Sequence, residues 1–329
     1  MIPVYVINLK HESDRMKNTL NECRKNGLTR VKRINAVYGK ELKPREIEKN
    51  SSFMCSKFCT FSTIGCAMSH KKAWETFLRS GNELGLIFED DIYIDNINFK
   101  EELKKKLNNV PNDFDILFLG CAVGCKKSES SLNVDNLVCG ALYNNKGYKR
   151  INKDIIIPET PLGLHAYIIS RKGAQKLLSS IANTKIYTHL DVQLLIEGRD
   201  LKVYASNPLL VYQKVSTETS SISSNYPVII NSVLHKYQTD HRIPHSYRLS
   251  VPIFELLKLP INGYAIILMI ICVLYSYLSK VNILFITLFF FVYNIFELRL
   301  YPSNFSLVIR LYMWIIFWIY IGRRLKTNN

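Results

Sequence analysis

The stretch GLIFEDDIYI, Gly85–Ile94, sets an apolar run directly before three consecutive acids. The apolar run predicts a buried strand, so Glu89, Asp90 and Asp91 fall at its carboxyl end. Ligands of parallel α/β sheets gather at such ends, and adjacent carboxylates repel one another unless a cation neutralises them. Two interpretations follow: a solvated strand end that caps the next turn, or an oxygen-ligand site for Mg²⁺ or Mn²⁺.

Strands and helices are predicted to alternate around this stretch. Residues 3–9 and 31–37 predict two strands with a helix between them, and residues 113–120 predict a further buried run. A helix is expected over residues 66–81, after an irregular polar loop over residues 51–65. This alternation through about residue 212 predicts an α/β fold with a Rossmann-like, mostly parallel sheet. The first strand is not followed by GxGxxG, so the dinucleotide-binding version lacks its signature.

The last quarter of the chain is more apolar than the rest, with only nine charged residues among the 79 from Val251 onward. Residues 261–279 lack charge and are long enough for a membrane span, whereas residues 281–296 are short for one. Residues 311–322 are rich in Trp and Tyr and flanked by basic residues, which also suits an interfacial helix. We expect two or three membrane-associated helices over residues 259–329; the alternative is the core of a second soluble domain.

The charge and the cysteines narrow the classes of partner only partly. The net charge of +16 favours polyanionic partners: nucleic acid, phosphorylated metabolites or an acidic membrane surface. The eight cysteines include no CxxC pair, and the C-x3-C pairs at Cys55/Cys59 and Cys121/Cys125 are loosely spaced for zinc. Free thiols in a reducing compartment are therefore expected. The start MIPVYVINL has no basic leader, so no secretory signal is expected and the catalytic part is expected in a cytosol.

The order of several short motifs resembles glycosyltransferase family 25, which contains bacterial lipooligosaccharide galactosyltransferases and relatives of the collagen galactosyltransferases. The resemblance covers roughly residues 2–215 and excludes the apolar tail. The matching pieces are Val6–Leu9 with Arg15, Gly65–Trp74, Leu86–Asp91, Asp113–Gly120 and His165–Leu178.

The resemblance implies a GT-A fold and a UDP-sugar donor, usually UDP-galactose or UDP-glucose, with inversion at the anomeric carbon. It gives the E-D-D sequence the part of the DxD element that holds Mn²⁺ or Mg²⁺ against the donor diphosphate. Asp91 is then the expected metal ligand, and Glu89 and Asp90 would contact the ribose, the waters of the metal or nearby backbone. The sequence is not a strict D-x-D, so the resemblance alone does not fix which carboxylate binds the metal.

Other residues receive roles from their positions in the motifs. Asn8 and Arg15 follow the first strand, where the nucleotide binds in this architecture, and Arg15 could pair with phosphate or be a solvated helix charge. Ser69 and His70 match the family's SH and would line the donor pocket, or His70 could form a structural hydrogen bond.

Asp191 matches the family's late aspartate and is the expected base for the acceptor hydroxyl, or else a helix N-cap. His235, His241 and His245 are weaker candidates for a late metal ligand.

The predicted organisation is a glycosyltransferase domain over residues 1–215, a linker or site-covering segment over 216–258 and the apolar tail. A membrane-held enzyme would suit a glycan, lipid-linked or protein acceptor. Two other classes compete: a glycosyltransferase-fold scaffold or nucleotide-sugar-binding module without activity, and a basic nucleic-acid-binding protein. No nucleic-acid partner is expected, because the Lys runs are short and resemble solvated faces.

Overall fold

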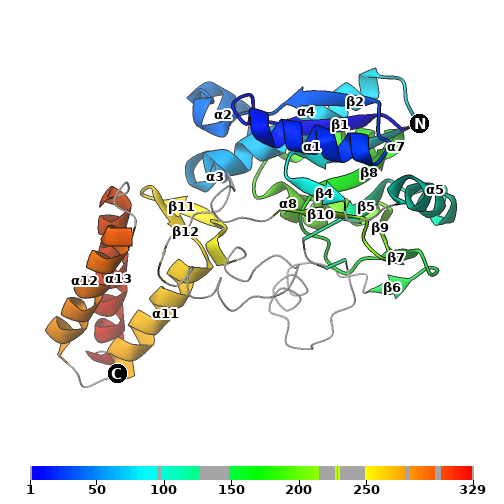
Figure 1. Ribbon diagram of the computed structural model, residues 1–329. Helices are drawn as coiled ribbons and strands as arrows, with labels where there is room; N and C mark the ends of the chain where they lie inside the picture. Colours follow the sequence, from blue (N-terminus) through cyan, green and yellow to red (C-terminus); the bar gives the residue numbers. More distant parts are fainter. Residues whose placement is uncertain are drawn as a thin grey trace. The chain divides into compact units, whose positions relative to one another are not determined.

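A computed structural model describes residues 2–94, 98–122, 124–125, 148–214, 227, 229, 249–278, 282–300 and 305–327 (Figure 1). The chain divides into two compact units. The first comprises residues 1–57 and 61–214, and the second comprises residues 58–60 and 215–329.

The first unit is built on an eight-stranded sheet of order β2-β1-β3-β8-β5-β9-β7-β6. The pairs β1–β2, β1–β3 and β5–β9 are parallel, whereas β8 is antiparallel to both β3 and β5, and β7 is antiparallel to β9 and β6. All strands except β7 and β8 therefore run the same way, which confirms the predicted α/β, mostly parallel sheet. The strands are β1 (Val4–Asn8), β2 (Val31–Asn35), β3 (Leu84–Glu89), β5 (Ile116–Gly120), β6 (Lys149–Arg150), β7 (Ile155–Ile157), β8 (Ala166–Ser170) and β9 (Val203–Ser206).

A separate two-stranded antiparallel sheet accompanies the main sheet. Strand β10 (Val211–Gln213) is antiparallel to β4 (Ile92–Ile94), which begins directly after the three acids. This pairing brings Gln213 opposite Ile92. A segment more than a hundred residues away in sequence is thereby held against the turn that carries the acids.

Helices connect and cover the strands of the first unit. Helix α4 packs against α7, β1 and the short helix η1 (Gly39–Glu41), and its Trp74 and Phe77 are fully buried. Burial of two large aromatic side chains contributes several kcal/mol, roughly 1.5–3 kcal/mol each, which fixes α4 on the sheet. The described helices of this unit, besides η1, are α1 (Ser13–Lys25), α2 (Pro44–Asn50), α3 (Phe53–Phe58), α4 (Phe61–Arg79), α5 (Phe99–Asn109), α7 (Arg171–Thr184), α8 (Leu190–Glu197) and η2 (Gly198–Asp200).

The region predicted as an irregular loop over residues 51–65 is instead helical. It contains α3 and the first turn of α4, which starts five residues before the predicted start. The prediction was wrong because it relied on the polar residues of this stretch. Cys55, Ile64 and Gly65 recur on the inner side and are buried or packed against neighbouring backbone.

In its described residues, the second unit contains a two-stranded sheet and three apolar helices. The strands β11 (Phe254–Leu256) and β12 (Leu259–Ile261) form an antiparallel hairpin that crosses the predicted boundary at residue 258. Helices α11 (Gly263–Leu278) and α12 (Ile283–Leu300) each pack against α13 (Phe305–Thr327), around a core that includes Ile315 and Ile319. Among the described residues, α13 is long and apolar enough to cross a membrane, and α11 is a shorter apolar helix. By itself, one such helix suggests membrane association only weakly.

The cysteine expectation is corrected by the structure. Cys121 and Cys125 form a disulfide, and Cys55 and Cys59 are also disulfide-bonded. Cys121 and Cys125 are separated by 4 positions, a spacing that suits a bond within a single turn of chain. In the described part of the chain, Cys23, Cys66 and Cys272 remain thiols.

Candidate active site

The three acids lie where β3 ends and the chain turns into β4. Glu89 is the last residue of β3, and parallel pairing sets it beside Ile7 of β1. Asp90 therefore lies next to Asn8, the last residue of β1. The sequence thus places a carboxylate cluster and an amide at the carboxyl edge of two adjacent parallel strands, as the strand-end argument predicts.

Asp90 is held on all sides by its neighbours. Asn8 Nδ2 donates to Asp90 Oδ2 at 2.6 Å, and the Thr19 hydroxyl donates to the Asp90 carbonyl at 2.8 Å. Arg15 Nη2 lies 2.8 Å from Asp90 Oδ1. Only 9% of the Asp90 side chain is exposed, so this carboxylate ties α1 to the two strands.

Asp91 shares the same arginine but keeps one oxygen without a hydrogen bond. Its Oδ2 lies 2.7 Å from Arg15 Nη2 and accepts from Gln213 Nε2 at 3.0 Å. Its Oδ1 is buried and has no hydrogen-bond partner among the described residues, and the same holds for Asn8 Oδ1. Buried oxygens of this kind are normally satisfied, so an unsatisfied carboxylate oxygen fits a site for a hard cation.

Burial and mutual repulsion separate the pKa values of the acids. Burial and repulsion from Glu89 raise the pKa of Asp91 to about 7, although Arg15 and Gln213 oppose the shift. Burial likewise raises the pKa of Asp90, against Arg15 and Asn8. For Glu89, burial would raise the pKa, but the hydrogen bond and charge of His70, together with His165 and Arg15, lower it.

A chain of buried polar side chains leads from the core to Glu89. Trp74 Nε1 donates to the Tyr167 hydroxyl at 2.7 Å, that hydroxyl lies 3.0 Å from His70 Nδ1, and His70 Nε2 lies 3.3 Å from Glu89 Oε1. An indole can only donate, so the single hydroxyl proton of Tyr167 is left for His70 Nδ1. With Nδ1 as the acceptor, the ring N–H lies on Nε2 and donates to Glu89. The chain therefore fixes the His70 tautomer and the direction of the Glu89 carboxylate.

Cys66 lies beside this chain. One ligand atom each of Cys66, His70 and Glu89 falls within 4.8 Å of the others, the spacing of a metal-ligand group. Burial, followed by the charges of Glu89, Asp191 and Asp91, raises the pKa of the Cys66 thiol well above its usual range. The thiol is therefore protonated, and both nitrogens of His70 are already engaged. In this arrangement the Cys66 side chain packs behind Glu89.

Ser69 does not point into an open site. Its hydroxyl accepts from Val37 N at 2.8 Å and donates to Gly65 O at 2.6 Å, and the residue is buried. A Cβ on Gly65 would stand 2.7 Å from Val37 O and 2.8 Å from Gly39 N, so only glycine allows this approach. The GCxxSH sequence therefore docks α4 against the loop that follows β2.

Asp191 lies in the first turn of α8, two residues past the N-cap His189. Its Oδ2 accepts from Gly163 N at 3.0 Å, and its Oδ1 accepts from Val192 N at 2.8 Å. Asp191 also acts electrostatically on the Cys66 thiol, as Glu89 and Asp91 do. The structure thus brings Asp191 to the same side of the first unit as the acids, in a half-buried position.

Sequence reasoning missed four residues that shape the site: Thr19, His165, Tyr167 and Gln213. Tyr167 and Gln213 reach the acids through the β3–β8 and β4–β10 pairings, and long-range strand register is not written in local sequence. The available signal was that Tyr167 carries a polar tip inside an apolar strand and therefore needs a buried partner. The late histidines at positions 235, 241 and 245 lie outside the described residues.

Comparison with known families adds the decisive observation. Residues 1–194 match a family described as Glycosyltransferase family 25 (LPS biosynthesis protein), and the match contains every element that builds the acidic site except β10. The chain belongs to glycosyltransferase family 25. Most of its first unit is therefore a family 25 domain, and the three acids at the end of β3 lie within the matched residues.

Similar proteins agree with this membership. Procollagen galactosyltransferase 2 of Homo sapiens is 26% identical over 261 residues, covering 68% of this chain and 38% of the relative. The Mus musculus protein of the same name matches with the same identity and coverage. The chain thus spans well under half the length of these relatives. A solved structure titled "Crystal Structure of A197 from STIV" covers 66% of this chain and 87% of its own, at 14% identity and a TM-score of 0.32.

Proposed function

We propose that this chain is a metal-dependent, inverting glycosyltransferase that moves a hexose from a UDP-sugar to a glycan, lipid-linked or protein acceptor. The observation that carries the proposal is the buried, unsatisfied Oδ1 of Asp91 at the acidic strand end of a family 25 domain. A protein that used these acids only as a strand cap would satisfy or expose that oxygen.

Asp91 and Asn8 are the residues proposed to hold Mn²⁺ or Mg²⁺, through the oxygens that lack hydrogen bonds. A divalent cation bound there would supply charge to stabilise the diphosphate that leaves the sugar. Arg15 already lies against Asp90 and Asp91. It therefore orients these carboxylates, and binding phosphate through Arg15, as the sequence suggested, would require a change in those contacts.

Glu89 and Asp191 are proposed to act on the substrates. The hydrogen bond from His70 keeps Glu89 ionised and oriented, so that it can accept from a ribose or sugar hydroxyl. Asp191 is the proposed base that takes the proton of the acceptor hydroxyl. The two backbone N–H groups that it accepts hold its carboxylate in one orientation, as a base aligned with a single acceptor hydroxyl requires.

Galactose is the first sugar to test, because the similar curated proteins are named procollagen galactosyltransferases. The second unit would hold the enzyme at a membrane through α13 and its neighbours. Disulfides persist in oxidising compartments, so the bonded cysteines argue against the cytosolic placement expected from the sequence. Mass spectrometry of the chain alkylated before and after reduction tests those bonds in cells.

One observation favours a second candidate, an inactive scaffold or nucleotide-sugar-binding module. Arg15 already compensates Asp90 and Asp91, and an internal cation of this kind can replace a metal. The scaffold candidate predicts that UDP-sugars bind with equal affinity with and without divalent cations, and that no sugar is transferred or released.

The test uses the full chain in neutral detergent with UDP-galactose or UDP-glucose, with Mn²⁺, Mg²⁺ or a chelator. We expect metal-dependent release of UDP, and NMR of the product is expected to report inversion at the anomeric carbon. Binding of UDP-sugar without any turnover under these conditions would favour the scaffold.

A further inference from the structure

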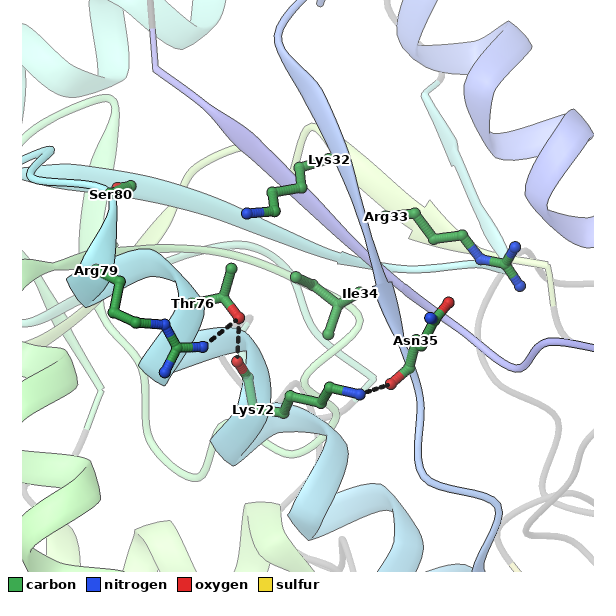
Figure 2. A pocket seen from close by; sticks show the side chains of 8 residues that line it. All are labelled: Lys32, Arg33, Ile34, Asn35, Lys72, Thr76, Arg79 and Ser80. Carbon is green, nitrogen blue, oxygen red and sulfur yellow. Dashed lines mark hydrogen bonds between the residues drawn. The ribbon is translucent and has the colours of Figure 1, made fainter.

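We propose that a basic pocket on the outer edge of the sheet binds the phosphate groups of an anionic ligand. The pocket lies between β2, the edge strand, and the second half of α4, and its volume is about 300 Å³ (Figure 2). It is lined by Lys32, Arg33, Ile34, Asn35, Lys72, Thr76, Arg79 and Ser80.

The lining side chains converge from two elements. Figure 2 shows Lys32 extending from β2 toward α4 and Lys72 extending from α4 toward β2. Arg79 lies on α4 at one side of the pocket. Arg33 extends to the opposite side of the strand, as alternation along β2 requires. The pocket is therefore bounded by three cations from two elements, with Arg33 at its rim.

No acid balances these cations. The lining residues include four cations and no carboxylate, and none of the four forms an ion pair within the described part of the chain. Their contacts are with neutral acceptors: Lys72 Nζ donates to Asn35 O at 2.8 Å, and Arg79 Nη2 donates to Thr76 Oγ1 at 3.3 Å. Like charges gathered without a counter-ion repel one another, and a bound anion would relieve that repulsion.

The chemistry of the lining selects phosphate among anions. An arginine fork matches phosphate oxygens in a bidentate way, and lysines add point charges around it. The Thr76 and Ser80 hydroxyls already donate to Lys72 O and Phe77 O, so the donors to a phosphate would be the N–H groups of the lysines and Arg79. A single water takes about 30 Å³ of liquid, so the pocket has room for a diphosphate or for the phosphate of a lipid headgroup.

This pocket is separate from the acidic site. In the parallel register, Lys32 pairs with Tyr5 and Asn35 with Asn8, so the pocket extends from the carboxyl edge back toward the start of β2. Within helix α4, His70 lies beside Glu89 of the acidic site, whereas Arg79, at the end of the helix, lies near the start of β3. The acidic site is proposed to hold a cation, whereas the pocket is lined by cations and would hold an anion. The proposal therefore stands whether or not the chain transfers sugar.

The simpler account of these cations is that lysines on an edge strand prevent pairing with another sheet, and that Arg79 complements the carboxyl end of its helix. Edge protection needs no pocket and no convergence of cations from a second element. The two accounts differ in whether a phosphate compound binds specifically at this place.

The experiment titrates the full chain in neutral detergent with inorganic diphosphate, or with phosphatidic acid in the same micelles, in the presence of a chelator. The chelator removes divalent cations, so the acidic site does not bind diphosphate. The variant is Lys32→Glu with Arg79→Glu, supported by the milder Lys32→Ala with Arg79→Ala. The matched control is Arg24→Glu with Lys104→Glu, which changes the net charge equally at exposed positions on α1 and α5.

We expect one probe to bind the wild type and the control alike, and to bind the charge-reversed variant at least about 10-fold more weakly. The alanine pair should fall between them. Binding of diphosphate alone would identify a soluble phosphate compound as the ligand class, and binding of phosphatidic acid alone would identify a lipid headgroup. Absence of binding with both probes, or an equal loss in the control, would overturn the proposal.

Discussion

The buried series of hydrogen bonds that links Trp74, Tyr167, His70 and Glu89 gives the sharpest prediction about the fold of the site. Tyr167→Phe removes the hydroxyl that accepts from Trp74 and donates to His70. Two buried hydrogen bonds of about 1 kcal/mol each are lost, and the indole N–H is left unsatisfied at a further cost of about 1–3 kcal/mol. The first unit should therefore lose about 3–5 kcal/mol of unfolding free energy.

The assay is urea unfolding of the full chain in neutral detergent, followed by tryptophan fluorescence. The chain has three tryptophans, and replacing Trp314 and Trp318 with Phe leaves Trp74 as the reporter of the first unit. The matched control is Tyr5→Phe, because Tyr5 is also buried and its hydroxyl forms no hydrogen bond within the described residues. That control should change the free energy by no more than about 0.5 kcal/mol. Equal effects of the two substitutions would refute the hydrogen-bonded chain.

Three further predictions concern other parts of the molecule. The pKa of Asp91 is raised in the folded state from 3.8 to about 7. Without divalent cations the folded state therefore holds the proton more tightly, and stability should fall as pH rises from about 4 to about 7, with a smaller fall in Asp91→Asn. Ser69→Ala leaves Val37 N without its acceptor and should cost about 1–3 kcal/mol in urea unfolding without changing metal affinity. Deleting Phe305–Thr327 should release the chain from vesicles in a flotation assay; unchanged flotation would contradict the membrane role of α13.

The sequence predicted the sheet and the acidic strand end, because both depend on local patterns. An apolar run before three acids indicates a buried strand whose carboxyl end is polar, and the structure confirms Glu89 as the end of β3. The alternation of strand and helix signals likewise predicted the α/β class. These features need no knowledge of which distant segments pair.

The roles of individual side chains depend on distant pairings and were harder to predict. Arg15 was predicted either to pair with phosphate or to be a solvated helix charge, and in the structure it lies against Asp90 and Asp91. Ser69 and His70 were predicted to line the donor pocket, with a structural hydrogen bond as the alternative for His70. In the structure the Ser69 hydroxyl docks α4 and His70 is hydrogen-bonded to Glu89, and the donor-pocket role stays a prediction. In each case the partner comes from another strand or loop, so sequence spacing could not reveal it.

The most direct test of the central claim is whether Asp91 holds a divalent cation that turnover requires. Electron paramagnetic resonance distinguishes bound from free Mn²⁺ in the full chain with UDP, and release of UDP from the UDP-sugar is measured in the same samples. Asp14→Asn is the matched control, because Asp14 is an exposed acid on α1 and loses the same charge.

The account predicts that wild type and Asp14→Asn bind Mn²⁺ and turn over. Asp91→Asn should lose the bound-metal signal and at least about 100-fold of the turnover, while its unfolding midpoint at pH 7 without divalent cations should be no lower than that of the wild type. Undiminished Mn²⁺ binding and turnover in Asp91→Asn would contradict the account.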